Sequence, residues 1–165
     1  MGEKIIAVSG GFDPVHIGHL RMIQEASKYG HVVVIVNSDD WLMRKKGYIF
    51  MPFDERCEIL EGFTATGETA NVDDRDGTVC EALRRIKPDY FANGGDRKTY
   101  NTPEMDVCEE LDIEMLWGVG GGKIQSSSTL VTDAGMEPPP LAEGDLKPSK
   151  VEVLASGDIA KIGNY

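Results

Sequence analysis

Long apolar runs and basic residues are scarce in this chain of 165 residues, and each shortage argues against a class of protein. No apolar run approaches the roughly 18 residues that a membrane-spanning helix needs, and the early stretch IIAVSGG is too short for a secretion signal. Lysine and arginine number 17 against 28 aspartates and glutamates, which gives a net charge of −11. That balance argues against nucleic acid or an anionic membrane as a partner. We therefore expect a cytoplasmic protein.

Cysteine is scarce as well, and its placement excludes two kinds of site. The three cysteines, Cys57, Cys80 and Cys108, are odd in number and form no C-x-x-C pair. We expect buried thiols in a reducing compartment rather than a disulfide framework or a zinc site. The chain also lacks a G-x-S-x-G nucleophile motif, which argues against one hydrolase class.

Short apolar runs alternate with segments of helical periodicity along most of the chain. Strands are expected at 4–9, 31–36, 69–72, 89–92 and 113–117, and helices at 16–29, 53–63, between Asp76 and Pro88, at 102–111 and at 126–134. A continuous β-branched run such as HVVVIV is typical of a strand that is buried on both faces. The alternation predicts an α/β, Rossmann-like, doubly wound parallel five-stranded sheet with helices on both faces.

Three local features complete this interpretation. Residues 41–51 mix cations and aromatics without a clear apolar period and are predicted to form a loop. Asp76 and Thr102 are predicted helix N-caps, the latter followed by a proline at the first helical position. Residues 135–165 contain EPPPLAEGDLKPSK and are predicted to be a proline-rich linker and C-terminal tail, separate from a domain at 1–134.

Polar or glycine-rich segments follow four of the expected strands. They are residues 10–19, 37–46, 93–97 and 118–128. Because the carboxyl ends of parallel strands meet at one edge, and ligands of such sheets bind there, we expect these four segments to form one site.

The segment GGFDPVHIGH, residues 10–19, uses two of the chain's three histidines. Glycines after a buried strand allow a tight turn, and the helix that follows offers unpaired N–H groups and a positive dipole end to an anion. His16 and His19 are three residues apart and share a helix face, so both imidazoles could donate to phosphate oxygens. The structural alternative is that His16 caps the helix and His19 packs in the core.

The same segment resembles the signature of the HxGH-motif nucleotidyltransferase, or cytidylyltransferase-like, superfamily. This superfamily includes glycerol-3-phosphate cytidylyltransferase and heptose-phosphate adenylyltransferase. Further similarity lies in NSDDWLMRKKG, FDERCEIL, KPDYFANGGDR and KIQSSSTL, so that the resemblance covers roughly residues 4–130. It implies transfer of a nucleoside monophosphate from ATP or CTP to a small phosphorylated acceptor, such as a sugar or polyol phosphate, with release of pyrophosphate. It also implies Mg²⁺ bound with the triphosphate and, for relatives of this size, a homodimer.

The resemblance also implies a role for each matching residue. The catalytic residues would be His16, His19 and Lys45. The nucleotide would be bound by Gly10, Gly11, Phe12, Asp13, Gly18, Gly95, Asp96, Ser126, Ser127 and Ser128. Arg56 and Lys46 would bind the substrate, and no protein side chains are expected to ligate a metal.

Simpler roles exist for several of these residues. Lys45 and Lys46 would then belong to a solvated charge run, the three serines would be an ordinary N-cap, and Arg56 would form an ion pair with Asp54 or Glu55.

The nucleotide and the acceptor stay open at this point. The glycerol-3-phosphate enzymes carry Arg-Thr-Glu-Gly where this chain has residues 121–124, GGKI, and a second arginine near the place of Thr64, which this chain lacks. NSD and NGGD favour the type that uses ATP and a heptose phosphate. The alternative functions are a non-catalytic nucleotide-binding or regulatory protein, and a different α/β enzyme that uses Asp13 and His16 as acid and base.

Overall fold

The computed structural model describes residues 2–94, 102–121 and 130–131. The chain divides into two compact units, Met1–Ser126 and Ser127–Tyr165. The second unit lies almost entirely outside the described residues, as does the predicted tail at 135–165, so the predicted boundary at residue 134 stays a prediction. The fold described here is that of the first unit.

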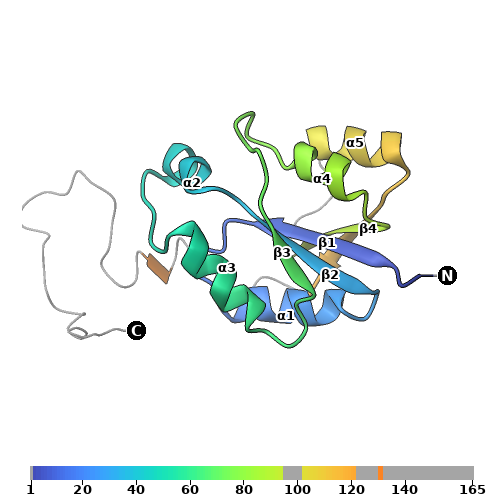
Figure 1. Cartoon of the computed structure of the whole chain (residues 1–165), viewed down its shortest axis with the longest axis horizontal. Helices are drawn as coiled ribbons and strands as arrows, with labels where there is room; N and C mark the ends of the chain where they lie inside the picture. Colours follow the sequence, from blue (N-terminus) through green and yellow to red (C-terminus); the bar gives the residue numbers. More distant parts are fainter. Residues whose placement is uncertain (1, 95–101, 122–129, 132–165) are drawn as a thin grey trace, which may run out of the picture. The chain divides into compact units, whose positions relative to one another are not determined.

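Within the described residues, five parallel strands form one sheet (Figure 1). They are β1 (Ile5–Gly10), β2 (His31–Val36), β3 (Glu68–Ala70), β4 (Tyr90–Gly94) and β5 (Glu114–Val119). Their order is β3-β2-β1-β4-β5, and β1 pairs with β2 along its whole length. This order is that of a doubly wound sheet, which confirms the predicted fold class.

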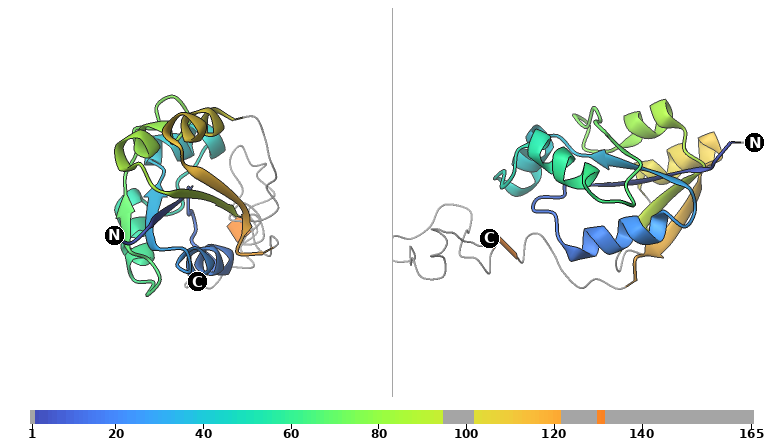
Figure 2. Two further views of the ribbon diagram at one scale, coloured as in Figure 1. Left: turned by 90° about the vertical axis from the view of Figure 1, so that its right-hand side faces the viewer. Right: turned by 60° about the horizontal axis from the view of Figure 1, so that its bottom comes forward.

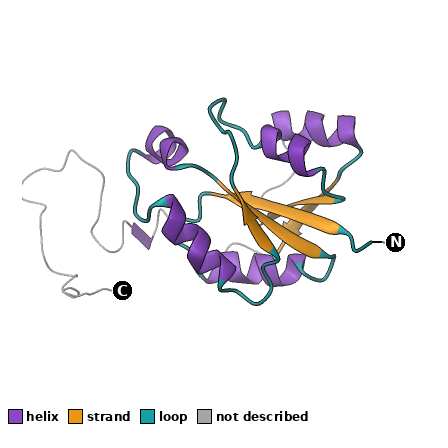
Figure 3. Ribbon diagram, viewed as in Figure 1, coloured by secondary structure: helices purple, strands orange, loops and turns teal. Residues whose placement is uncertain are grey.

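Helices cover both faces of the sheet, as Figure 3 shows by secondary structure and Figure 2 from two further directions. One face carries α1 (Ile17–Ala26) and α3 (Phe53–Glu61), and the other carries α4 (Cys80–Ile86) and α5 (Pro103–Leu111). The faces change because the chain winds from β1 toward β3 and then crosses back to β4, while each crossover keeps the same hand. Among the helices described, none combines the length and apolarity needed to cross a bilayer.

The core follows from the alternation of side chains along each strand. Val34 in β2 packs with α1 and α3, whereas its neighbour Ile35 packs with α4 and α5. Both side chains are fully buried. A strand buried on both faces needs apolar residues at consecutive positions, which explains the uninterrupted run in β2.

The segment predicted to be a loop at 41–51 has two parts: residues 41–46 are helical, so the prediction was wrong there, and residues 47–51 are non-helical as predicted. Asp39–Lys46 forms α2, which buries only Leu42 and therefore shows no apolar period. Its ends are defined by local chemistry instead. The Ser38 side chain accepts the N–H of Trp41, and Gly47 ends the helix with a φ of 86°.

Two other local predictions had different outcomes. Thr102 is the N-cap residue of α5, followed by Pro103 as predicted. Asp76 does not cap α4, because its carboxylate accepts from Thr78, whose hydroxyl in turn accepts the N–H of Cys80. Of the helix expected at 126–134 the structure describes only residues 130–131, which are helical.

Candidate functional site

The carboxyl ends of the strands meet at one edge of the sheet, and the winding direction reverses between β1 and β4. These two strands are neighbours in the sheet. In sheets of this kind a ligand binds beyond the carboxyl ends, at the switch point. The loop that follows β1, residues 11–16, leaves the sheet there and leads into the two histidines.

His16 caps the amino end of α1. Its Nδ1 accepts the N–H of Gly18 at 3.1 Å, and its own backbone N–H donates to Nδ1 of His19 at 3.1 Å. These reciprocal bonds form a capping box. A Cβ on Gly18 would lie 3.0 Å from the His16 ring, so glycine leaves room for the cap. The ligand contact predicted for Gly18 stays a prediction.

The hydrogen bonds also assign the tautomers of both histidines. A neutral imidazole that accepts at Nδ1 carries its proton on Nε2. His16 and His19 both accept at Nδ1, so each is an Nε2–H donor when neutral. Their rings stack with centroids 3.8 Å apart and planes 23° apart, which brings the two donors together at the start of α1.

His19 stays neutral at physiological pH. Burial is the largest cause, and the His16 ring and the Lys46 ammonium add to it; together they lower the pKa of His19 to about 3. The ring of Phe12 packs edge-on against it, with centroids 4.7 Å apart. His16 thus caps the helix as in the structural alternative, while His19 is half-buried against Phe12, and the hydrogen bonds of the cap also define the Nε2–H tautomers.

The Gly-Gly turn after β1 has a packing role. Phe12 has a φ of 54° and is 2% exposed, and its side chain lies in the core between the sheet and α1. A Cβ on Gly10 would lie 3.3 Å from the Phe12 ring, and one on Gly11 would lie 3.0 Å from Leu42. The two glycines therefore allow the backbone after β1 to lie close to the Phe12 ring and to α2. The structure does not bring the Phe12 side chain to the surface of the site.

Asp13 is also buried, in contrast to the nucleotide-lining role predicted for it. Its carboxylate is fully buried and accepts the N–H of Phe50 at 2.7 Å and that of Met51 at 2.5 Å. Burial raises the pKa of Asp13, against the opposing effect of these two hydrogen bonds and of the positive charges of Arg56 and Lys46. Asp13 therefore ties the loop after β1 to the loop after α2.

Arg56 has the structural role that was the alternative to substrate binding. It forms an ion pair, but with a different acidic residue from the two expected. Its side chain is fully buried and donates to three backbone carbonyls, those of Gly11, Asn37 and Met51. Its charge is paired with Asp39 at 2.6 Å, not with Asp54 or Glu55. Its contacts join the ends of β1 and β2 to α2 and to the loop after it.

The two lysines at the end of α2 differ in their surroundings. Lys45 is exposed, with Nζ 5.6 Å from the centroid of the Trp41 ring. Lys46 is half-buried, and burial lowers its pKa while the Asp13 carboxylate opposes that effect. The Lys46 charge is also one of the causes that lower the pKa of His19.

One buried group at this edge was missed by the sequence interpretation. The carboxylate of Asp74, in the segment after β3, accepts from the Asn37 side chain and from both the N–H and the hydroxyl of Ser38. Its backbone carbonyl accepts from Arg44 of α2 at 2.7 Å. The sequence does carry a signal for α2, the helix that Asp74 contacts. Ser38 is followed by two acidic residues and, six residues after Ser38, by three basic ones, which is the pattern of a capped helix.

The remaining predicted site residues lie outside the described residues. They are Gly95, Asp96, Ser126, Ser127 and Ser128. Their predicted contacts with a nucleotide therefore stay predictions. The described part of the chain brings together no group of three or more histidine, cysteine, aspartate or glutamate side chains that could hold a metal ion.

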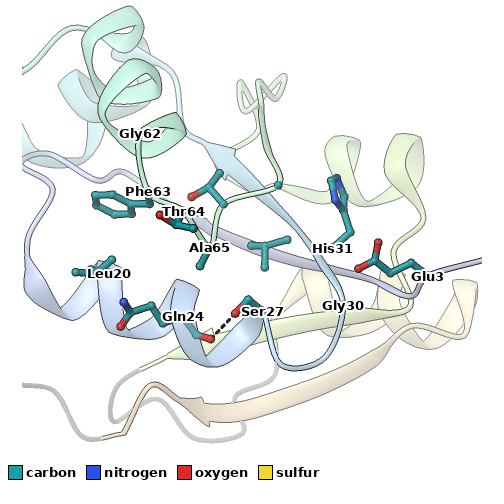
Figure 4. A pocket seen from close by; sticks show the side chains of 13 residues that line it. Glu3, Leu20, Gln24, Ser27, Gly30, His31, Gly62, Phe63, Thr64 and Ala65 are labelled. Atoms are coloured by element: carbon teal, nitrogen blue, oxygen red, sulfur yellow. Dashed lines mark hydrogen bonds between the residues drawn. The ribbon is translucent and has the colours of Figure 1, made fainter.

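A hollow of about 770 Å³ opens at the opposite edge of the sheet (Figure 4). Its walls come from the second half of α1, with Gln24 and Ser27, from the start of β2, with His31, and from the loop after α3, with Phe63 and Thr64. None of the predicted site residues that the structure describes lines it. The histidine pair and this hollow are thus separate features of the molecule.

Comparison with known proteins identifies relatives of the first compact unit of the chain, which carries the candidate site. A family model described as Cytidylyltransferase-like matches residues 7–121. The bifunctional protein HldE of Hahella chejuensis is 36% identical over 111 residues, which are 66% of this chain and 23% of that protein. The FAD synthase of Ferroglobus placidus is 30% identical over 95 residues, 58% of this chain and 60% of that protein. The chain thus spans about a quarter of the HldE proteins that it matches.

Solved structures show the same fold. A lipopolysaccharide core biosynthesis protein from Thermoplasma volcanium aligns with a TM-score of 0.58 at 21% identity, over 70% of this chain and 96% of that one. A putative nicotinate-nucleotide adenylyltransferase from Vibrio parahaemolyticus aligns with a TM-score of 0.52 at 17% identity, over 84% and 95% of the two chains.

Proposed function

This chain belongs to the cytidylyltransferase-like family of nucleotidyltransferases, and from that premise we propose that it transfers a nucleoside monophosphate from ATP or CTP to a small phosphorylated acceptor. The observation that carries the proposal is the histidine pair at the start of α1. His16 and His19 are both Nε2–H tautomers, stacked at the switch point of the sheet beside a helix amino end. Such donors suit the oxygens of a triphosphate.

The reaction needs positioning and charge stabilisation rather than a general base. An oxygen of the acceptor's phosphate attacks the α-phosphorus, and a new P–O bond forms there. The bond from the α-phosphorus to the oxygen that bridges to the β-phosphate breaks, and pyrophosphate leaves with that electron pair. A phosphate dianion is already a nucleophile, so the protein's task is to align the groups and to stabilise the negative charge on the transferring phosphate.

Each residue has a part in this proposal. His16 and His19 donate to the triphosphate, and the lysines at the end of α2 supply positive charge, because a neutral His19 supplies none. Mg²⁺ enters with the triphosphate, whose oxygens together with water are its preferred ligands. Gly95, Asp96 and the serines at 126–128 complete the proposed nucleotide site on the basis of the family resemblance. The homodimer is proposed on that basis alone.

The NSD and NGGD segments favour ATP and a sugar phosphate over CTP and glycerol phosphate. A FAD synthase among the relatives adds a flavin phosphate to the acceptors worth testing. A protein that binds the nucleotide without transferring it is the second candidate, and the same assay separates the two.

The test is pyrophosphate release from MgATP or MgCTP with a panel of sugar phosphates, glycerol phosphate and FMN. We expect release with one nucleotide and one acceptor, and a loss of about a hundredfold or more in the variant His16→Ala, because one donor to the transition state is removed. The matched control is His31→Ala, since His31 lies at the opposite edge and pairs with Glu68. Tight triphosphate binding with no release across the panel would favour the binding protein. Equal activity in both variants would contradict the proposed site.

A further inference from the structure

The two loops around the histidine pair are joined by one buried carboxylate. We infer that Asp13 is a positioning residue, which anchors the loop after α2 and thereby sets the place of the end of that helix, where Lys46 lies. This inference rests on the proposed function and deepens it. In this inference Asp13 does not make the direct contact with the nucleotide that the sequence predicted, but acts through Lys46.

The anchor uses both oxygens of the Asp13 carboxylate. Oδ2 accepts the N–H of Phe50 at 2.7 Å and Oδ1 accepts the N–H of Met51 at 2.5 Å, so two consecutive peptide groups are held at once. Hydrogen bonds to an ionised acceptor are about twice as strong as those between neutral groups. A fully buried carboxylate is costly unless it is well paired, so its two donors are an integral part of the structure.

A second contact completes the anchor from the other side of Met51. Nε of Arg56 donates to the carbonyl of Met51 at 2.9 Å, and its Nη1 donates to the carbonyl of Gly11 at 2.7 Å. Both peptide groups of Met51 are therefore tied to the loop that leads into His16. Just upstream, Gly47 ends α2 with a φ of 86°, so only residues 48 and 49 separate the helix end from the anchor.

The lysine at the end of α2 is Lys46, whose pKa is affected by Asp13. The charged groups that act on Lys46 are Asp13, which favours the ammonium, and Arg56 and Lys45, which oppose it; His19 is neutral. Burial of Lys46 also disfavours its charge. Among these charges only that of Asp13 favours the ammonium form of Lys46, while Lys45 lies exposed against Trp41.

The first test compares Asp13→Asn with Asp54→Asn in the full-length protein. Asparagine keeps the shape of Asp13 but can accept with one oxygen only and carries no charge, whereas Asp54 is an exposed acid in the first turn of α3. We expect the amides of Phe50 and Met51 to exchange with deuterium about tenfold faster in Asp13→Asn, and the affinity for MgATP or MgCTP to fall about tenfold. Asp54→Asn should change neither.

A second pair of variants removes the donor instead of the acceptor, which keeps the inference testable if Asp13→Asn does not fold. Phe50→Pro deletes one anchoring N–H at an exposed side chain, and Phe50→Ala retains that N–H while removing the ring. We expect weaker triphosphate binding in the proline variant and normal binding in the alanine variant. Equal binding in the two would overturn the anchor.

The third test asks whether Asp13 acts through Lys46. Adding Asp13→Asn to Lys46→Gln should cost little further affinity, whereas adding it to Lys45→Gln should cost about as much as in the wild type. In Asp13→Asn alone, the loss of affinity at alkaline pH should begin at a lower pH, because Lys46 loses its favourable partner.

The possible failures are distinguishable. A wild-type protein that binds no triphosphate would overturn the proposed function and the ligand part of this inference. Unchanged amide exchange at Phe50 and Met51 in Asp13→Asn would overturn the anchor alone. Faster exchange with unchanged affinity would overturn the positioning role.

Discussion

The stacked imidazoles of His16 and His19 combine a structural and a chemical role in the same atoms. Each Nδ1 accepts a backbone N–H in the cap of α1, and that bond places the proton of the neutral ring on Nε2. The hydrogen bonds of the cap thus make Nε2–H of each neutral ring the donor group. Because the pKa of His19 is about 3, this ring donates without carrying a charge at neutral pH. In the proposed function, electrostatic attraction of a triphosphate would depend on the lysines of α2 and on the dipole of α1.

The low pKa of His19 predicts a pH dependence of stability. In the unfolded chain the imidazole titrates near its ordinary value of 6.5, while the folded chain takes up this proton only near pH 3. The unfolded state therefore binds more protons as the pH falls below 6.5, and the folded state loses stability. Between pH 7 and pH 5 this linkage amounts to about 2 kcal/mol. We expect the free energy of unfolding by urea to fall by about that much more in the wild type than in His19→Gln.

The comparison between the two proteins isolates this one group. The raised pKa of Asp13 acts with the opposite sign, since it adds stability as the pH falls, but it is common to both proteins. Parallel stability curves for the wild type and His19→Gln would show that the folded state protonates His19 readily, and would contradict a neutral, buried ring.

The helix α2 carries Lys45 and Lys46 and yet buries almost nothing. Only Leu42 of its eight residues is buried. Packing therefore contributes little to its stability, and isolated helices of this length are marginal. Its position depends on polar contacts at its start, where the Asp74 carboxylate holds Ser38, and along its length, where Arg44 reaches the carbonyl of Asp74.

Removing the charge of Asp74 should therefore loosen α2. In Asp74→Asn one oxygen becomes an amide donor facing the donors of Asn37 and Ser38, and we expect a loss of about 2 kcal/mol in the free energy of unfolding. Amide exchange within α2 should rise as well. The adjacent Asp73→Asn is the control, because Asp73 pairs with Arg75 at the surface and should matter far less. Equal effects of the two would show that the Asp74 cluster does not hold the helix.

At the scale of the whole folded unit, residues distant in sequence meet where β5 ends against α1. Gly120 follows β5 directly, and a Cβ there would lie 2.8 Å from the Cα of Met22 in α1. This backbone contact joins the last strand to the helix whose first turn holds the histidine pair. Glycine is needed for the close approach and also for the φ of 91°.

Adjacent glycines allow these two requirements to be separated. Gly121 has a φ of 86°, and an added Cβ meets no described atom within 4 Å. We expect Gly121→Ala to cost about 1 kcal/mol for the left-handed backbone alone, and Gly120→Ala to cost at least about twice that because the helix must also move. Thermal unfolding measures both. Equal losses would mean that β5 and α1 adjust to each other without strain.

Most of the elements that could be predicted from the sequence have apolar patterns. Consecutive β-branched residues identified β2, and helical spacing identified α1, α3 and α4, whereas α5 was identified by the N-cap and proline at its start. The helix α2 was not found because periodicity reports burial, and α2 is held by caps and charges. The N-cap expected at Asp76 failed for a related reason: a neighbouring hydroxyl, that of Thr78, makes the contact instead.

What the sequence by itself determined is the family and the fold class, because a motif and an alternation of strands and helices are local patterns. Tertiary structure alone decided the partners. Arg56 pairs with Asp39 and three carbonyls, and Asp13 holds the peptides of Phe50 and Met51, 37 and 38 residues away. Such pairs depend on which loops the sheet order brings to one edge. No local pattern contains that information, since burial and long-range contact arise only when the strands take their order.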